Sequence, residues 1–299
     1  MLRFGIDLGG TKTELIALDS NGQTLLRERT PTPADDYGAI LETVCRLIRE
    51  AERCLGCKGS IGIATPGALS SRTGLLKNSN TTVLNGKPLD RALAERVGRE
   101  IRMENDANCF ALSEATDGAA AHGRVVLGII LGTGVGGGVI VDGRIVRGRN
   151  SIAGEWGHNP IPWPRPDEQP GPACYCGRHG CIETYLSGPG MARDFHQRAG
   201  IRRSPEAIVA SARCADAHGG ASLGAYVDRL ARGLATVINV LDPDVIVLGG
   251  GLSNIPELYR DVPPLLRRYV FSDGVIDTSI VPARHGDSSG VRGAARLWP

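Results

Sequence analysis

The hydrophobic pattern along the first half of the chain predicts alternating strands and helices. Three short apolar runs predict strands over residues 2–8, 13–19 and 23–30, which tight turns join. A helix is expected over residues 37–54, where apolar residues recur at helical spacing. A buried strand at 60–64, a strand at 101–104 and a helix from there to about residue 116 follow.

The order strand, glycine-rich turn, strand, which residues 2–19 show first, occurs a second time along the chain. Residues 125–131 predict a strand, Gly132–Gly138 a turn and residues 139–141 another strand. This weak duplication has a period far too long for a solenoid. Residues 160–172 contain six prolines and predict an extended surface loop. A long helix near 221–241, a strand at 244–248 and a last helix near 290–297 complete the pattern.

Composition narrows the classes of function. A chain of 299 residues is long enough for two domains. Its net charge of +2 gives no reason to expect nucleic acid or a membrane surface as partner. No run approaches the roughly 20 apolar residues of a membrane-spanning helix, and the first residues lead straight into a strand without a signal region. Five scattered cysteines read as reduced, which indicates a cytoplasmic protein.

Glycines gather in turns that could hold phosphates. Asp7–Thr13 passes from a strand into a second strand, which excludes a Rossmann fingerprint and a Walker loop, because both need a helix there. Backbone N–H groups and the Thr11 hydroxyl would face a phosphate, and Asp7 could hold a hydrated divalent ion. A plain glycine-rich hairpin is the alternative. The turn at 132–138 and a third at Gly249–Gly251 make nucleotide binding the better interpretation of the set.

Asp106 lies where a predicted strand ends and a helix begins. An aspartate at this place is commonly an N-cap. The phosphate-type turns on either side favour a second interpretation, in which Asp106 accepts the proton of an attacking hydroxyl.

Three closely spaced cysteines and a histidine predict a zinc site. Cys174, Cys176 and Cys181 follow His158 by sixteen residues or more, and three thiolates with one imidazole form the closed tetrahedral set of structural zinc. Ordinary buried thiols or a disulfide are the alternatives. The free nitrogen of His158 would donate a hydrogen bond beside Glu155 and Glu183, a surface suited to sugar hydroxyls. Both glutamates could instead be solvated residues around the metal.

Together these segments resemble the ROK family of repressors, open reading frames and sugar kinases. The resemblance rests on Gly5–Lys12, Pro66-Gly67, Glu104–Asn108, Leu131–Gly138, Gly154–His158, Cys174–Glu183 and Leu248–Gly251. It implies an α/β fold of two RNase H-like domains of the actin, hexokinase and Hsp70 superfamily with a central cleft. The smaller domain would comprise residues 1–117, completed by a helix at about 289–299, and the larger residues 118–288.

The resemblance also implies a role for each matching residue. Asp106 would be the catalytic base, and ATP, Mg²⁺ and structural Zn²⁺ would be the cofactors. The sugar ligands would be Gly67, Asn80, Asn105, Asp106, Glu155, His158 and Glu183. The nucleotide would contact Asp7, Gly9, Gly10, Thr11, Lys12, Gly132, Thr133, Gly134, Gly136, Gly249, Gly250 and Gly251, and zinc would bind His158, Cys174, Cys176 and Cys181. A small-molecule sugar is the expected partner, in a homodimer.

Within the family, three stretches are most similar to fructokinases: 77–86, Glu155–Pro160 and 285–295. The expected reaction is therefore phosphorylation of D-fructose at its 6-hydroxyl, with mannose or glucose as further substrates. N-acetylglucosamine kinase is the alternative, although Phe typically replaces Trp156 there. A sugar-responsive repressor is disfavoured because Asp7 leaves no room for a preceding DNA-binding segment, and a non-catalytic sugar sensor is the remaining rival.

Overall fold

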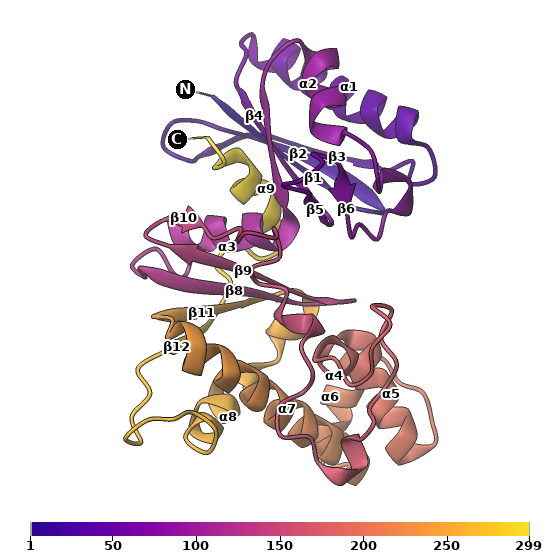
Figure 1. Cartoon of the computed structure of the whole chain (residues 1–299), viewed down its shortest axis with the longest axis vertical. Coiled ribbons are helices and arrows are strands. Elements are labelled where there is room, and N and C mark those ends of the chain that lie inside the picture. The colour runs from indigo at the N-terminus through magenta and orange to yellow at the C-terminus, as the bar shows by residue number, and fades with distance from the viewer. Residues whose placement is uncertain (1, 299) are drawn as a thin grey trace. The chain divides into compact units, whose positions relative to one another are not determined.

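The computed structural model describes residues 2–298, which form two five-stranded sheets and the helices that cover them (Figure 1). The first sheet contains β1 (Arg3–Leu8), β2 (Lys12–Leu18), β3 (Thr24–Pro31), β4 (Ser60–Thr65) and β7 (Ile101–Asn105). The second contains β8 (Val125–Leu131), β9 (Val135–Val141), β10 (Arg144–Ile145), β11 (Val245–Gly249) and β12 (Ser279–Pro282). A short ribbon pairs β5 (Ala68–Leu69) with β6 (Leu76–Lys77).

The two sheets share one strand order. The first runs β3-β2-β1-β4-β7 and the second β10-β9-β8-β11-β12, so each places its first strand in the centre. In the first sheet β1, β2 and β3 are antiparallel neighbours, whereas β4 and β7 join in parallel. In the second sheet β11 pairs in parallel with β8 and β12. This repeated order confirms the predicted α/β class and the duplication, although the sequence pattern missed β12.

The chain divides into two compact units. The first consists of residues 1–118, 138–153 and 287–299, and the second of residues 119–137 and 154–286. The division falls within β9. The boundary expected between residues 117 and 118, which would separate the smaller from the larger domain, stays a prediction.

In the first unit, helices cover both faces of the sheet. Side chains of β2 alternate: Leu15 and Ala17 join the cluster that α1 (Tyr37–Leu55) and α2 (Leu89–Val97) complete. Ile16 and Leu18 join α9 (Ser289–Ala295) on the opposite face. Each face of the strand therefore buries its own apolar layer.

The contact with α9 explains two strand glycines. A Cβ on Gly5 would lie 2.0 Å from the carbonyl oxygen of Val291, and one on Gly62 would lie 1.8 Å from that of Ala294. No side chain fits at such distances, so glycine is required for α9 to approach β1 and β4. The helix α3 (Asp106–Thr116) also packs on α9.

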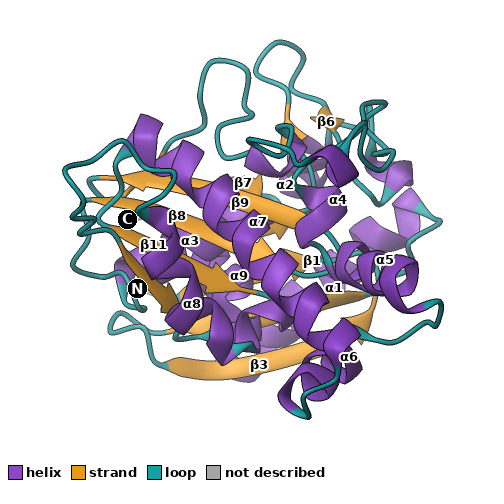
Figure 2. Ribbon diagram, turned by 90° about the horizontal axis from the view of Figure 1, so that it is seen from below, coloured by secondary structure: helices purple, strands orange, loops and turns teal. Residues whose placement is uncertain are grey.

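In the second unit, the long helix α7 (Ala217–Leu241) is the centre of the helical layer. It contacts α4 (Glu183–Leu186), α5 (Gly188–Ala199), α6 (Pro205–Arg213) and α8 (Pro256–Leu266) (Figure 2). Short 3₁₀ turns lie at Thr82–Leu84, Trp156–His158, Pro166–Glu168, Gly251–Asn254 and Gly286–Ser288. Within residues 2–298, no helix combines the length and the apolar character that crossing a membrane requires.

The proline-rich stretch is not simply the extended surface loop that the sequence predicted. Glu168, at the end of its 3₁₀ turn, is only 5% exposed. Its carboxylate accepts hydrogen bonds from Arg229 and Arg232 of α7 at 2.7 and 2.8 Å. The loop is therefore anchored by a buried ion-pair cluster whose partners lie more than 60 residues away in the sequence.

Candidate functional site

The first glycine turn lies between β1 and β2. The Gly9 N–H donates to the Lys12 carbonyl at 3.0 Å, and a Cβ on Gly9 would lie 2.9 Å from the same oxygen. Gly10, Thr11 and Lys12 are exposed. The turn is thus a tight hairpin whose outer residues are open to a ligand. This geometry agrees both with a phosphate-binding turn and with a plain glycine-rich hairpin.

Asp7 is the second-last residue of β1 and lies on the face that α9 covers. A Cβ on Gly290 would lie 3.3 Å from its Oδ2 atom, so the first turn of α9 closes over this carboxyl group. Burial and then the negative charges of Asp106 and Glu14 raise the pKa of Asp7 to about 7. Asp7 and Asp106 therefore lie near enough to repel each other, an arrangement that a divalent cation would relieve.

The helix α3 begins with Asp106, but Asp106 is not its N-cap. The Oδ1 atom of Asn105 accepts from the backbone N–H groups of Ala107 and Asn108, at 2.9 and 3.3 Å. The interpretation of Asp106 as the N-cap is therefore wrong, because its neighbour Asn105 is the N-cap. Asp106 occupies the first helical position, where the partial positive charge of the helix N-terminus favours a carboxylate.

Asn105 and Gly67 lie together, as predicted for two residues of one site. The Asn105 side-chain amide donates to the Gly67 carbonyl at 3.1 Å. Gly67 has φ +84°, and a Cβ there would lie 2.3 Å from the Lys77 carbonyl, so no other residue fits. Asn80 is exposed on the neighbouring loop, and a pair of hydrogen bonds of 2.9 Å between Asn85 and Ser79 fixes this loop.

Glu104 is a site component that sequence reasoning missed. It is 8% exposed, and its Oε1 atom accepts from the Asn105 N–H at 3.0 Å and from the Asn108 side chain at 3.1 Å. Its other oxygen pairs with Arg147. Glu104 thus holds both ends of the segment that carries Asp106. Its sequence signals were its place directly before Asn105 at the end of a strand and its membership of the segment Glu104–Asn108, to which no role of its own was assigned.

The second glycine turn, in the other unit, is shorter than predicted. It comprises Gly132, Thr133 and Gly134, because β9 already begins at Val135. The Glu183 carboxylate accepts from the Val135 N–H at 2.9 Å, and a Cβ on Gly134 would lie 2.7 Å from that carboxylate. A predicted sugar ligand and a predicted phosphate turn therefore meet directly.

Gly136 and Gly137 both contact Trp156. Gly136 lies within β9, and its carbonyl accepts from the indole N–H of Trp156 at 3.3 Å. A Cβ on Gly137 would lie 2.8 Å from the Trp156 ring. Trp156 is only 4% exposed. Gly137 therefore makes room for the Trp156 ring, whereas Gly136 offers it a backbone carbonyl; the nucleotide contact expected for Gly136 stays a prediction.

The third glycine turn lies beside the second. Gly249 ends β11 and pairs in register with Ile130 of β8, so both turns follow the carboxyl ends of neighbouring parallel strands. Gly250 has φ +81°, and a Cβ there would lie 2.5 Å from the Leu131 carbonyl. Ligands of α/β sheets typically bind at this edge.

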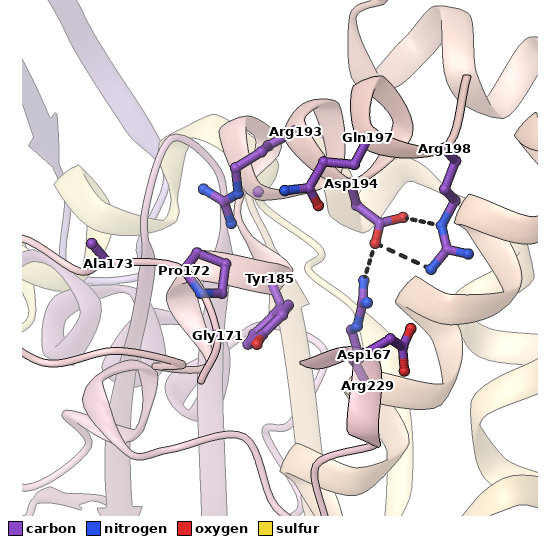
Figure 3. Close-up of a pocket in the computed structure, with 11 residues that line it drawn as sticks. Asp167, Gly171, Pro172, Ala173, Tyr185, Arg193, Asp194, Gln197, Arg198 and Arg229 are labelled. Carbon is purple, nitrogen blue, oxygen red and sulfur yellow. Dashed lines mark hydrogen bonds and ion pairs between the residues drawn. The ribbon is translucent and has the colours of Figure 1, made fainter. Parts of the chain in front are cut away.

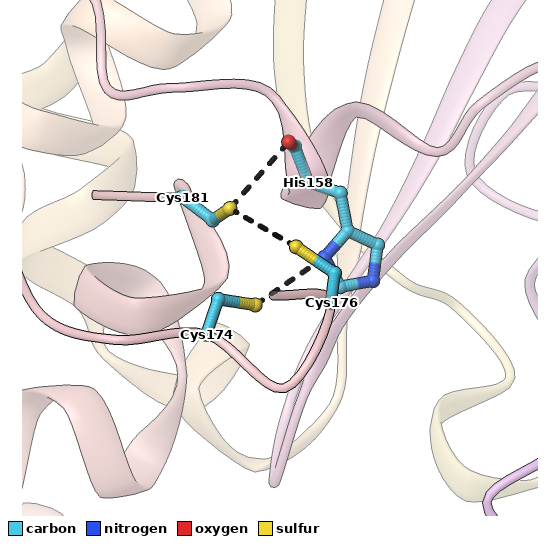
Figure 4. A group of neighbouring side chains, drawn as sticks. All are labelled: His158, Cys174, Cys176 and Cys181. Atoms are coloured by element: carbon cyan, nitrogen blue, oxygen red, sulfur yellow. Dashed lines mark hydrogen bonds between the residues drawn. The ribbon is translucent and has the colours of Figure 1, made fainter. Parts of the chain in front are cut away.

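The four predicted zinc ligands come together (Figure 4). One ligand atom from each of His158, Cys174, Cys176 and Cys181 lies within 4.8 Å of all the others. The Cys176 and Cys181 sulfurs are 3.6 Å apart, as are the Cys174 sulfur and His158 Nδ1. Tetrahedral zinc with Zn–S bonds of about 2.3 Å needs sulfurs about 3.8 Å apart. The donor set and its spacing therefore fit zinc.

The second nitrogen of His158 faces a tyrosine. His158 Nε2 lies 2.9 Å from the hydroxyl of Tyr175, and the two rings meet edge to face with centroids 5.1 Å apart. Tyr175 is 83% exposed. Partial burial of its hydroxyl and then the carboxylates of Glu183 and Glu155 raise the pKa of Tyr175. The expected sugar-binding cluster thus includes a hydroxyl group of the protein itself.

Comparison with known proteins gives consistent matches. The ROK family description matches residues 3–299. The N-acetyl-D-glucosamine kinase of Escherichia coli O127:H6 is 43% identical over 302 residues, which cover 98% of each chain. The crystal structure of a ROK hexokinase from Thermus thermophilus is 33% identical with a TM-score of 0.87, and covers 99% of this chain and 97% of that one.

A ROK glucokinase from Streptomyces griseus, solved in complex with glucose and AMPPNP, is a further match. It is 28% identical with a TM-score of 0.80 over 99% of each chain. The matches extend over the full length of both sheets, so they support the predicted fold class throughout.

Proposed function

Because the chain belongs to the ROK family, we propose that it is a sugar kinase that transfers a phosphoryl group from ATP to the 6-hydroxyl of N-acetylglucosamine. The single observation that carries the kinase reaction is the position of Glu183 against the second glycine turn: its carboxylate accepts from the N–H of Val135, directly after the turn, and lies where a side chain on Gly134 would be. A carboxylate suited to sugar hydroxyls thus lies beside a turn suited to polyphosphate, and a kinase needs both ligands side by side.

The choice of sugar rests on the relative that is 43% identical over 98% of both chains. Fructose was the first expectation, partly because Trp156 stands where Phe is typical of N-acetylglucosamine kinases. In this fold Trp156 is buried between Gly136 and Gly233, so it is a packing residue and says little about the substrate. N-acetylglucosamine is therefore the better supported substrate.

Asp106 is the proposed catalytic base. Its neighbour Asn105 caps the helix, and the Glu104 carboxylate accepts a hydrogen bond from the Asn105 N–H. The segment that carries Asp106 is therefore fixed without Asp106 serving as the cap. It would accept the proton of the attacking hydroxyl. ATP would supply the phosphoryl group, and Mg²⁺ would neutralise negative charge on the phosphates. The three glycine turns, with Asp7, Thr11, Lys12 and Thr133, are the proposed contacts of the nucleotide and its metal.

The sugar hydroxyls are proposed to bind Glu155, His158 and Glu183, with Gly67, Asn80 and Asn105 as further contacts. Zinc would be held by His158 Nδ1 and the three thiolates, so that His158 Nε2 carries a proton and donates it in a hydrogen bond. Tyr175 lies at this donor, so a sugar hydroxyl that binds there must displace it. A homodimer and a cytoplasmic location also stay predictions.

A coupled assay that follows ADP release tests this function. Turnover would be measured with ATP and, in turn, N-acetylglucosamine, fructose, mannose and glucose. We expect the highest kcat/KM with N-acetylglucosamine. A higher value with fructose would restore the first expectation, and no turnover with any sugar would indicate a sensor.

A further inference from the structure

A cavity of about 620 Å³ lies in the second unit, and neither the glycine turns nor the four metal-binding residues line it (Figure 3). Its walls are the chain segment just before Cys174, formed by Gly171, Pro172 and Ala173, together with residues of α5 and α7. Pockets for small molecules typically enclose about 300–1,000 Å³, so this one has the size for a metabolite.

Most charges around the cavity neutralise each other. Asp194 accepts from Arg198 at 2.8 Å and from Arg229 at 2.8 Å. Arg229 also pairs with the buried Glu168 at 2.7 Å. These two arginines are therefore fully engaged as structural ion pairs and are not available to a ligand.

Arg193 is different. It is partly buried and lines the cavity, yet within residues 2–298 no carboxylate lies within ion-pair distance of its guanidinium group. Its one hydrogen bond in the structure goes to the carbonyl of Thr184. Figure 3 shows the guanidinium group extending toward Pro172, away from the Asp194 ion pairs. A partly buried guanidinium group that no carboxylate pairs with directly is a ready receptor for an anion, above all a phosphate group, and Asp194 acts on Arg193 only at longer range.

The remaining polar groups of the cavity suit a hydroxylated ligand. Gln197 lies one helical turn after Arg193 on α5, and Figure 3 places its amide beside that arginine. Asp167 contributes a further exposed carboxylate to the lining. A sugar carrying a phosphate offers the anion that Arg193 lacks and the hydroxyls that the amide and the carboxylate can bind.

We propose that this cavity is a regulatory site for a sugar phosphate, with the phosphate group on Arg193. The identification of the ligand as the kinase's own product class rests on the proposed function, whereas the anion site does not. An anion that binds Arg193 competes with the Thr184 carbonyl for its N–H groups. Thr184 is the neighbour of Glu183 in α4, so occupancy of the cavity is communicated to the proposed sugar ligand.

The test is calorimetric titration with N-acetylglucosamine 6-phosphate. The protein is first saturated with N-acetylglucosamine and a non-hydrolysable ATP analogue, so that only a second site can respond. We expect one binding event per chain under these conditions. We expect Arg193→Gln to weaken it about tenfold to a hundredfold, because a hydrogen bond to a charged group is lost. Arg198→Gln, whose arginine is already paired, is the matched control and should bind within about twofold of the wild type.

Gln197→Glu keeps the Arg193 side chain itself and guards against misfolding of the arginine variant. Its new carboxylate one turn away would occupy Arg193 and should abolish binding. The proposal is overturned if saturated protein binds no phosphate ester, or if both variants bind as the wild type does. If the phosphate ester binds at Arg193 but no sugar is phosphorylated, the pocket stands and the proposed function falls.

Discussion

The buried carboxylate of Glu168 allows the sharpest prediction of stability. Burial raises the pKa of the Glu168 carboxyl group, whereas hydrogen bonds from Arg232, the Arg165 backbone and Arg229 lower it. The hydrogen bonds outweigh burial, so the pKa falls from 4.5 to about 2. A lowering of the pKa from 4.5 to about 2 corresponds to roughly 3 kcal/mol of folding free energy near pH 7. Glu168→Gln should therefore lower the free energy of unfolding by about 3 kcal/mol.

The same shift fixes the pH dependence and its sign. A carboxyl group whose pKa is lower in the folded state stabilises the protein above its unfolded value of 4.5. This contribution is lost as the pH falls from 4.5 toward 2, so it should decrease from about 3 kcal/mol at pH 7 to about 2 kcal/mol at pH 3.5. The gap between wild type and Glu168→Gln should narrow accordingly.

Urea unfolding at the two pH values measures both effects. Glu50→Gln is the matched control, because Glu50 forms an exposed pair with Arg46 and its loss should change stability by less than about 0.5 kcal/mol. Glu168 also anchors the loop that leads to Cys174, so the variant should release bound zinc faster to a chromogenic chelator. Equal stability of Glu168→Gln and Glu50→Gln would refute the reasoning.

Four further predictions concern the site. Asp106→Asn should lower kcat by about a hundredfold or more with little change in melting temperature or ATP affinity; near-normal turnover would remove Asp106 from the mechanism. Cys176→Ser should lose zinc in metal analysis and bind sugar more weakly, and a metal-free variant with wild-type sugar affinity would contradict this coupling. Tyr175→Phe removes the hydroxyl that occupies His158 Nε2, so calorimetry should show tighter sugar binding; weaker binding would make Tyr175 a ligand. The pKa of Asp7 is about 7 in the folded protein against 3.8 for an unperturbed aspartate, so the free energy of unfolding should fall as the pH rises between these values. Without Mg²⁺, Asp7→Asn should therefore melt at a higher temperature than the wild type at pH 8. An unchanged melting temperature would refute the raised pKa.

Local patterns in the sequence predicted much of the fold. The helical spacing of α1 and the apolar runs of β4 and β11 are decided by neighbours in the chain, and the structure has these elements within one or two residues of the predicted bounds. β12 was missed because it is four residues long and none of them is fully buried, so it carries no clear apolar run. The cysteine cluster was predictable because its ligands are close in sequence.

The roles of several residues could not be predicted because they depend on contacts with residues far away in the sequence. Gly137 of β9 was assigned to a turn because the indole of Trp156, which leaves no room for a side chain there, lies about twenty residues away in the sequence. Glu168 was placed in a surface loop because Arg229 and Arg232 are distant in the chain. Asn105 and Asp106 are both good N-cap residues, and only the backbone geometry shows that Asn105 is the cap.

The most direct test of the central claim is a competition in one vessel. The protein would receive equal concentrations of N-acetylglucosamine and fructose with limiting ATP and Mg²⁺, and mass spectrometry would measure the two phosphorylated products. Their ratio reports the ratio of kcat/KM values. We predict that N-acetylglucosamine phosphate predominates; a predominance of fructose phosphate, or no phosphorylated sugar, would contradict the account.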